Sequence, residues 1–420
     1  MKNVETLCRE IKNASRLLAT IESDKKNQFL TILADWLLAR QEMIVMENTR
    51  DIADGLANGL SDALIDRLTL TPARIEGMAN DVRHVVTLPD PVREVFENST
   101  TPQGLRVRKQ RVPLGVLAVI YESRPNVTVD VAALAIKSGN AIILRGGKET
   151  IRSNQALVDG IHAALEAAGL PKGAVQFISE PDRSHVETLL KMHTYIDMLI
   201  PRGGAGLHQY CRENSTIPVI TGGIGICHLF VDESAELAQS VEVIRNAKIQ
   251  RPTVCNALDT VLVHQAIAAE LIPMLVLELQ KDGVSFRLDP AALAYVSGME
   301  NAMVIPAGVD DFDTEWLSLV LSVKVVDDVD QAINHIAAHS THHSDGILTT
   351  SKENAQKFIT MVDSAAVYVN ASTRFTDGSQ LGLGAEVAIS TQRLHARGPM
   401  ALRELTTYKW VIEGDYTIRQ

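Results

Sequence analysis

The strongest constraint on the fold is an alternation of short apolar runs with stretches of helical periodicity, which begins at Val116. The runs at residues 116–121 and 141–144 have the length of strands, and the segment 126–138 between them has a helical pattern. Further apolar runs lie at 175–178, 198–200, 219–220 and 229–231, and a further helical pattern lies at 154–168. Strands separated by helices of this length predict a parallel sheet covered on both faces, which is an α/β fold.

A second alternating block follows, with a strand near 260–263 and helical patterns at 265–281 and 329–339. Two other segments, 105–112 and 406–420, alternate residue by residue and are predicted to be strands. The basic residues in the first of these fit a solvated ribbon or a subunit contact better than an anion site.

Length and charge limit the classes of protein. A chain of 420 residues is too long for one compact core, so two or three domains are expected. Acidic residues outnumber basic ones by 51 to 40, and the net charge of -11 argues against generic binding to nucleic acid or anionic membranes. The charged N-terminal segment predicts no signal peptide, and no apolar run has the length of a membrane span. Four cysteines are too few for a disulfide framework, so the cytoplasm is the expected compartment.

One cysteine is a candidate for chemistry. Cys255 lies in the polar segment QRPTVCN at 250–256, between a helical pattern and a strand, where a loop thiol near Arg251 is accessible and partly ionised. The alternative, a buried structural cysteine, is the more frequent outcome for a single cysteine and stays open at this point. Cys8, Cys211 and Cys227 lie within helical or strand patterns, which favours burial.

The familiar nucleotide and metal motifs are absent. Neither a G-x-G-x-x-G string nor a P-loop occurs, so residue patterns alone do not predict a classical dinucleotide site. A histidine-rich run at 335–343 places His335 and His339 on one helix face, but no glutamate lies between them. We therefore expect hydrogen-bonded histidines at a helix end and no metal.

Several strings resemble the γ-glutamyl phosphate reductases, a family within the aldehyde dehydrogenase superfamily. They are VPLGV at 112–116, YESRPNV at 121–127, RGGKE at 145–149, IPRGG at 200–204, GGIGICH at 222–228, AKIQRP at 247–252, GLGAE at 382–386 and HARGP at 395–399. The run at 332–345 resembles the signature stretch of the same family. The resemblance covers nearly the whole chain, and several strings are typical of the family rather than of the superfamily.

This resemblance implies an aldehyde dehydrogenase-like α/β fold in three parts. Residues 1–99 and 113–231 would form a parallel-sheet NADP-binding domain, and residues 232–404 an α/β catalytic domain. Residues 100–112 and 405–420 would form a small β oligomerisation ribbon, so a homo-oligomer is expected. That fold binds its dinucleotide without the glycine fingerprint, which accounts for the missing motif.

The resemblance also implies roles for individual residues. Cys255 occupies the position of the nucleophile, and Asn126 that of the asparagine that binds the oxyanion. Arg145 and Lys148 follow the strand that leads to the adenosine end of the cofactor, and their charge favours NADPH over NADH. Other implied cofactor residues are Gly203, Gly204 and Glu315, and the arginines considered for the substrate are Arg124, Arg202 and Arg397.

The implied reaction is the NADPH-dependent reduction of L-glutamyl 5-phosphate to L-glutamate 5-semialdehyde and phosphate in proline biosynthesis, through a thioester on Cys255. Hydrolytic aldehyde dehydrogenases place a glutamate before a Gly-Gly pair, whereas Ile220 and Thr221 precede Gly222 here, so a base for water attack is missing. The glutamate 5-kinase that makes the acyl phosphate is a candidate partner. Two alternatives stay open: a coenzyme A-acylating aldehyde dehydrogenase, and a catalytically silent nucleotide-binding assembly protein.

Overall fold

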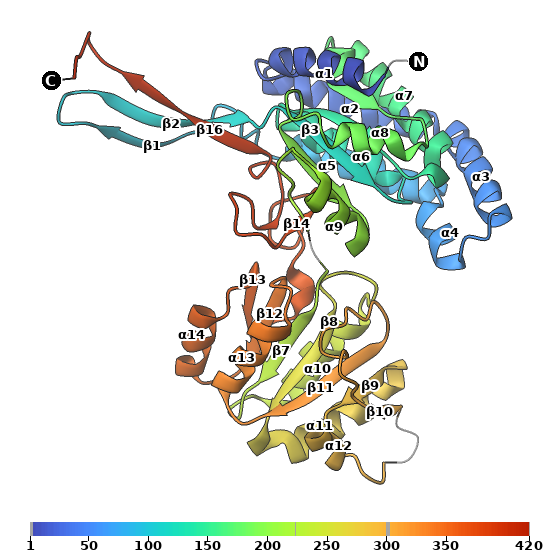
Figure 1. Cartoon of the computed structure of the whole chain (residues 1–420), viewed down its shortest axis with the longest axis vertical. Helices are drawn as coiled ribbons and strands as arrows, with labels where there is room; N and C mark the ends of the chain where they lie inside the picture. The colour runs from blue at the N-terminus through green and yellow to red at the C-terminus, as the bar shows by residue number, and fades with distance from the viewer. Residues whose placement is uncertain (1–2, 223, 300–302, 420) are drawn as a thin grey trace. The chain divides into compact units, whose positions relative to one another are not determined.

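The computed structural model describes residues 3–222, 224–299 and 303–419, which fold into two compact units. Unit 1 comprises Met1–Thr221, Gly382–Ala388 and Met400–Gln420, and unit 2 comprises Gly222–Leu381 and Ile389–Pro399. Figure 1 labels the helices and strands of both units. Each unit has its own parallel sheet and its own core.

The centre of unit 1 is a four-stranded parallel sheet in the order β5-β4-β3-β6. Its strands are β3 (Val116–Tyr121), β4 (Ala141–Arg145), β5 (Val175–Phe177) and β6 (Met198–Arg202). Every residue of β3 and β4 is buried, which explains why these segments read as continuous apolar runs. The connections are α6 (Asn126–Lys137), η1 (Lys148–Thr150) with α7 (Ile151–Ala167), and α8 (Arg183–Leu189). The predicted α/β class is confirmed.

Five helices precede this sheet: α1 (Val4–Leu18), α2 (Ser23–Ala39), α3 (Gln41–Ala57), α4 (Asp62–Leu68) and α5 (Pro72–Thr87). Helix α2 packs against α5 and α7, and its residues Phe29, Leu30, Leu33 and Leu37 recur at helical spacing and are fully buried. Lys26 on the same helix forms a buried ion pair of 2.8 Å with Asp90. Helix α9 (Ala205–Asn214) follows β6 directly.

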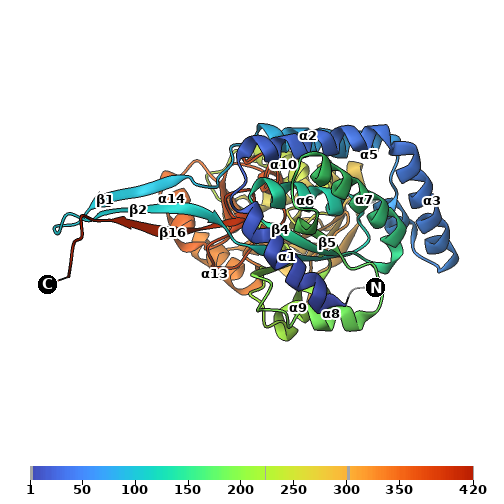
Figure 2. The ribbon, with the colours of Figure 1, turned by 90° about the horizontal axis from the view of Figure 1, so that it is seen from above.

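A three-stranded antiparallel ribbon, in the order β1-β2-β16, projects from the rest of unit 1 (Figure 2). Its strands are β1 (Val95–Thr100), β2 (Arg106–Pro113) and β16 (Thr406–Glu413). The sequence placed β2 and β16 in the ribbon but assigned most of β1 to the cofactor domain. β1 belongs here because it pairs along β2, and its largely exposed side chains gave no apolar pattern to detect.

Unit 2 contains a seven-stranded sheet in the order β10-β9-β11-β8-β7-β12-β13, and all its neighbouring strands run parallel. The strands are β7 (Cys227–Val231), β8 (Leu258–His264), β9 (Ser285–Leu288), β10 (Val304–Pro306), β11 (Val320–Val326), β12 (Ser344–Leu348) and β13 (Ala366–Val369). Its helices are α10 (Leu237–Ile249), α11 (Gln265–Leu279), α12 (Pro290–Ala294), α13 (Val329–His339) and α14 (Lys352–Met361).

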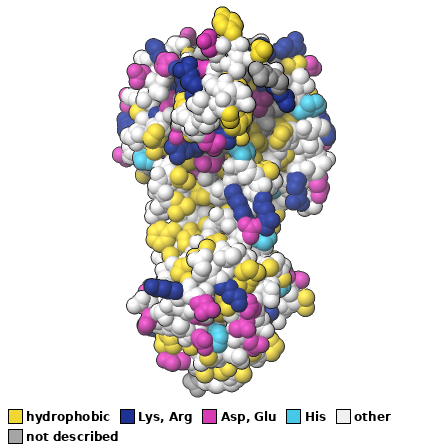
Figure 3. Space-filling view, turned by 90° about the vertical axis from the view of Figure 1, so that its left-hand side faces the viewer, with side chains coloured by type: hydrophobic (Ala, Val, Ile, Leu, Met, Phe, Trp, Pro, Cys, Tyr) yellow, Lys and Arg dark blue, Asp and Glu magenta, His cyan; other side chains and the backbone are white. Residues whose placement is uncertain are grey.

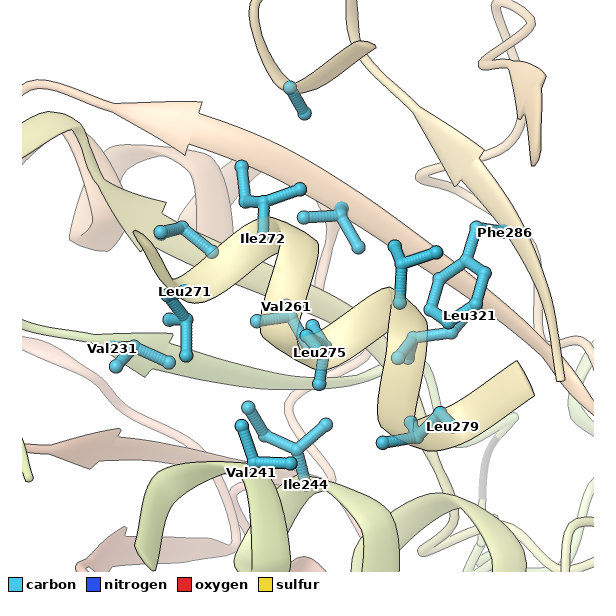
Figure 4. Packing of buried hydrophobic residues seen from close by; sticks show 14 of the residues in the cluster. Val231, Val241, Ile244, Val261, Leu271, Ile272, Leu275, Leu279, Phe286 and Leu321 are labelled. Carbon is cyan, nitrogen blue, oxygen red and sulfur yellow. The ribbon is translucent and has the colours of Figure 1, made fainter. Parts of the chain in front are cut away.

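Helix α11 anchors the larger apolar core of unit 2, shown in Figure 4. Its residues Leu271, Leu275 and Leu279 are fully buried among side chains of the central strands and of α10. A second core, which includes Phe230, Leu262 and Ile336, involves α13 and α14. Helices therefore bury the sheet on both faces, as a parallel sheet requires.

The chain passes from unit 1 to unit 2 after Thr221, whereas the family resemblance implied a domain boundary after Val231. The difference arises because β7 pairs with β8 on one side and β12 on the other, both far along the chain. Residues 382–388 and 400–404, which the sequence assigned to the catalytic domain, group with unit 1. Within unit 1 the backbone N–H of Val387 donates to the carbonyl oxygen of Met400 at 2.8 Å. The strand expected at 219–220 is only an isolated bridge between Leu199 and Val219.

Two observations bear on whether the protein binds membranes or nucleic acid. Across the described part of the chain, no helix combines the length and apolar character of a bilayer span. On the face drawn in Figure 3, acidic and basic side chains are interspersed rather than gathered by sign.

Candidate active site

Cys255 lies in unit 2, on the loop between the end of α10 and the start of β8, and a backbone bond from Ala257 to Val254 closes a turn around it. It is half-buried, whereas the other three cysteines are buried. Burial raises the pKa of Cys8 to about 12, that of Cys211 to about 11, and that of Cys227 well above its ordinary value. Because a nucleophilic thiol must ionise and meet its substrate, Cys255 is the best-placed of the four.

The backbone of Cys255 is held tightly by the segment that leads into β7. A Cβ added to Gly225 would lie 1.6 Å from the carbonyl oxygen of Cys255, so no side chain fits at this position. The same carbonyl accepts a hydrogen bond of 3.2 Å from the Cys227 thiol. Cys227 is thus buried, as expected from sequence, and it also positions the loop of the nucleophile. The segment GGIGICH is one of the family strings, but local sequence does not predict that it contacts Cys255.

Glu315 contacts this arrangement through Gly225. Its Oε1 accepts the Gly225 backbone N–H at 2.9 Å, and the next N–H, that of Ile226, donates to Thr341 Oγ1 at 2.9 Å. Burial raises the pKa of Glu315, and the bond from Gly225 opposes that rise. Within unit 2 the fold therefore brings together Cys255 and Glu315, both predicted as site residues, with one glycine between them.

On its other side the loop of Cys255 is tied to a short helix, η4 (Thr373–Phe375). Asn256 Nδ2 donates to the carbonyls of Arg374 and Thr376 at 3.3 and 3.0 Å, and Thr373 Oγ1 donates to the Asn256 carbonyl at 2.7 Å. The guanidinium of Arg374 in turn donates to Gln250 Oε1 at 2.8 Å. Arg374 could not be predicted from sequence, because these contacts join segments more than a hundred residues apart.

Asn126 is the first residue of α6 in unit 1. Its Nδ2 donates to Oδ2 of Asp130, one helical turn later, at 2.9 Å. Burial raises the pKa of Asp130 to about 7, while the bond from Asn126 and the charge of Arg202 act against that rise. Because an amide nitrogen carries two hydrogens, this bond fixes the orientation of the amide and leaves one hydrogen for another acceptor. The spacing of four residues between Asn126 and Asp130 is the feature of the sequence that could have predicted this contact.

The two basic residues expected near the cofactor differ in exposure. Arg145 is buried at the end of β4, where its guanidinium donates to the carbonyls of Gly146 and Pro181. Burial lowers the pKa of Arg145, and its Nε has no hydrogen-bond acceptor among the described residues. Lys148 is exposed at the start of η1. Of the two, only Lys148 presents its charge to the solvent.

Gly203 and Gly204 form the turn between β6 and α9. A Cβ on Gly203 would lie 2.5 Å from the Glu122 carboxylate, whereas nothing lies within 4 Å of one built on Gly204. The Gly204 N–H donates to Glu122 Oε2 at 3.0 Å. The turn therefore has an open side at Gly204, and Glu122, which the sequence analysis did not single out, holds it in place.

The three arginines considered for the substrate lie in different settings. Arg124 is exposed, and Arg202 is half-buried at the end of β6, where its charge acts on Asp130. Arg397 in unit 2 donates to Asp363 Oδ1 at 2.6 Å, so a carboxylate already compensates its charge.

The histidine-rich run forms a packed polar cluster within unit 2. The rings of His335 and His339 lie 4.3 Å apart on α13, and His339 Nδ1 contacts Asp313 at 2.8 Å. The buried Asp345 on β12 pairs with His228 Nδ1 at 3.1 Å. Among the residues that the structure describes, no group of three or more His, Cys, Asp or Glu side chains is arranged to hold a metal ion.

Comparisons with known proteins show the family to which the chain belongs. The family model described as the aldehyde dehydrogenase family matches residues 1–292. A γ-glutamyl phosphate reductase of Escherichia coli O6:K15:H31 is 58% identical over 408 residues, which is 97% of this chain and 98% of that protein. The chain belongs to the γ-glutamyl phosphate reductases of the aldehyde dehydrogenase family.

The family resemblance and the fold class inferred from sequence are thus confirmed. The crystal structure of γ-glutamyl phosphate reductase from Thermotoga maritima matches the whole of both chains with a TM-score of 0.97 and 46% identity. An acetylating aldehyde dehydrogenase from Geobacillus thermoglucosidasius shares the fold, with a TM-score of 0.70 over 99% of this chain at 18% identity. The γ-glutamyl phosphate reductases are oxidoreductases of amino-acid biosynthesis.

Proposed function

We propose that this enzyme reduces L-glutamyl 5-phosphate to L-glutamate 5-semialdehyde and phosphate in proline biosynthesis, with Cys255 as nucleophile and NADPH as reductant. The observation that carries the proposal is the half-buried Cys255 loop, held by Gly225 and Cys227, in a chain 58% identical to γ-glutamyl phosphate reductases along almost its whole length. The other three cysteines are buried, with raised pKa values, and are unsuited to attack.

In this proposal the Cys255 thiolate attacks the carbonyl carbon of the acyl phosphate. A carbon–sulfur bond forms, the bond from carbon to the phosphate oxygen breaks, and phosphate leaves with the electron pair. The oxyanion of the intermediate would accept a hydrogen bond from the Cys255 backbone N–H, and the family resemblance assigns a second donor, the amide of Asn126, each worth about 3–4 kcal/mol of barrier. The bond from Asn126 to Asp130 supports this role, because it fixes the direction of the amide before substrate arrives.

NADPH, when bound, supplies the hydride that converts the thioester to the aldehyde. Taken unit by unit, the residues suit such a group. In unit 1 Lys148 is exposed and could meet the 2′-phosphate, and Gly204 leaves open space beside its turn. In unit 2 Glu315 offers a carboxylate whose Oε1 is bonded to Gly225. Arg145 would stabilise the segment between β4 and Lys148, because its guanidinium donates to the backbone carbonyls of Gly146 and Pro181.

The thioester must survive until it is reduced. No acidic residue occurs between Ile217 and Gly225, so this segment offers no carboxylate to activate water. That composition suits an enzyme whose acyl group must not be lost to hydrolysis.

An assay of the reverse reaction tests the proposal against the coenzyme A-acylating alternative. Glutamate 5-semialdehyde and NADP⁺ are supplied with either inorganic phosphate or coenzyme A, and NADPH formation is followed. We expect turnover that depends on phosphate, none with Cys255→Ala, and slower turnover with NAD⁺. Turnover that requires coenzyme A, or activity retained by Cys255→Ala, would contradict the proposal.

The cellular setting follows from this chemistry. We place the enzyme in the cytoplasm, where thiols stay reduced, and supplied by a glutamate 5-kinase that makes the acyl phosphate. We further propose that the ribbon of β1, β2 and β16 mediates a homo-oligomer, because Tyr408, Trp410 and Ile412 are exposed along its last strand.

A further inference from the structure

Two arginines from separate segments of unit 2 lie beside the candidate nucleophile. Arg251 precedes Cys255 in the same loop and is exposed, and Arg374 lies on η4 and is half-buried. Burial lowers the pKa of Arg374, the charge of Arg251 lowers it further, and Asp377, Cys255 and Cys227 act in the opposite direction. The charges of Arg251 and Cys255 therefore both act on the Arg374 guanidinium, which places it within electrostatic range of the nucleophile loop.

The position of Arg374 is fixed with respect to Cys255. Asn256, the residue after the nucleophile, donates to the backbone carbonyl of Arg374, and Gln250, five residues before the nucleophile, accepts from Nε of the guanidinium. η4 is therefore bonded to the loop on both sides of Cys255. An arginine held at its Nε keeps both terminal nitrogens for a further acceptor.

No ion pair among the described residues compensates the charge of Arg374, whereas several other half-buried arginines have one. Within the described residues, no carboxylate lies within 4.0 Å of Arg374 or of Arg251. Three other half-buried arginines each pair with a carboxylate: Arg111 with Glu94, Arg245 with Asp282 and Arg287 with Asp311. A guanidinium withdrawn from water is costly unless an anion meets it, so an anionic ligand is the natural partner of Arg374.

We propose that Arg374, assisted by Arg251, forms the subsite for the phosphoryl group of the acyl phosphate substrate. This inference rests on the proposed function, because it takes Cys255 as the nucleophile. In an acyl phosphate the phosphoryl oxygen is bonded to the carbon that the thiolate attacks, so the phosphoryl group must lie next to the Cys255 sulfur. A planar guanidinium binds phosphate oxygens in pairs, which a single amine does not.

The subsite would act on the leaving group. When the carbon–sulfur bond forms and the carbon–oxygen bond breaks, the electron pair moves onto the departing phosphate, and Arg374 meets the added negative charge. In the reverse direction the same group would hold inorganic phosphate while its oxygen attacks the thioester carbonyl. Arg374 would therefore make phosphate, rather than a coenzyme A thiol, the acceptor of the acyl group.

The test measures the KM for inorganic phosphate in the reverse assay with Arg374→Gln, Arg374→Lys and Arg251→Gln. Arg245→Gln is the matched control, since that side chain is bonded to Asp282 on another part of unit 2. We expect Arg374→Gln to raise the KM for phosphate about tenfold to a hundredfold, with smaller rises for the other two variants and none for the control. The KM for semialdehyde should stay within about twofold of the parent, because it does not involve the phosphoryl group. The limiting rate at which iodoacetamide alkylates Cys255 at high pH should also stay within about twofold, because the thiol is then ionised with or without a nearby guanidinium.

An unchanged KM for phosphate in Arg374→Gln would overturn the subsite. A loss of activity matched by an equal loss of thiol alkylation would also overturn it, since that pattern would mean that Arg374 activates or supports Cys255 instead. If Arg374→Gln does not fold, as judged by thermal melting, Arg374→Lys and Arg251→Gln decide by the same criterion. A parent enzyme without phosphate-dependent turnover would instead refute the proposed function itself, so the two failures are distinguishable.

Discussion

Replacement of Gly225 by alanine tests whether the backbone of the nucleophile is fixed by close packing. The added Cβ would lie 1.6 Å from the Cys255 carbonyl oxygen, whereas Cβ contacts below 3.0 Å essentially do not occur. The two segments must therefore separate by about 1.4 Å, from 1.6 to 3.0 Å, and backbone cannot rotate away as a flexible side chain does. Because a displacement of about 1 Å at a reacting group costs about a hundredfold in rate, we expect kcat to fall by about a hundredfold or more.

The assay is NADPH oxidation with the acyl phosphate, or its reverse, together with a thermal melt and the NADPH dissociation constant. Gly308→Ala is the control, because its nearest neighbours would lie 3.7 Å away, which is ordinary contact. We expect the control to keep the parent's kcat. Gly225→Ala should lose less in NADPH affinity than in kcat, because Glu315 is the one proposed cofactor residue that is bonded to Gly225 in the described residues. A Gly225→Ala enzyme with kcat within about threefold of the parent would refute the argument that this contact positions Cys255.

Three further predictions concern unit 1. Asn126→Ala should lose about a hundredfold in kcat with little change in NADPH affinity, as steady-state kinetics and a binding titration will show; an unchanged kcat would remove Asn126 from the oxyanion site. Burial raises the pKa of Asp130 to about 7 from an ordinary value of 3.8, so its contribution to stability is complete below the unfolded pKa and is lost as pH rises through about 7. Asp130→Asn does not ionise, so its melting temperature relative to the parent should rise between about pH 5 and pH 8, and a constant difference would contradict the raised pKa. Lys148→Ala should weaken NADPH by about tenfold and leave NADH nearly unchanged, whereas equal losses for both cofactors in a binding titration would place Lys148 away from the 2′-phosphate.

The parts of the fold that local sequence encodes were the parts that could be predicted. β3 and β4 are buried on both faces, so they appear as unbroken apolar runs, and α6 lies between them with a clear helical period. β7 has the same local pattern, but its pairing with β8 and β12 depends on contacts far along the chain. The boundary expected after Val231 therefore differs from the division of the two compact units at Thr221, although the strand itself was recognised.

The candidate site divides in the same way. Cys255 was singled out by its loop position and by strings that resemble a family, and Asn126 by such strings alone. The structure then shows Cys255 half-buried and the other three cysteines buried. Arg374 was missed because the short helix that carries it has no distinctive pattern and reaches the nucleophile loop only through tertiary hydrogen bonds. Local patterns show which residues suit a chemistry, but long-range packing decides which of them meet.

The most direct measurement is to trap and locate the covalent acyl group. Parent enzyme is mixed with glutamate 5-semialdehyde and NADP⁺ without phosphate, quenched in acid, digested and analysed by peptide mass spectrometry. We predict a glutamyl thioester on the peptide that contains Cys255, discharged when phosphate is added before the quench and missing in Cys255→Ala. An acyl group on a different residue, or an unmodified Cys255 peptide from enzyme that turns over normally, would contradict the account.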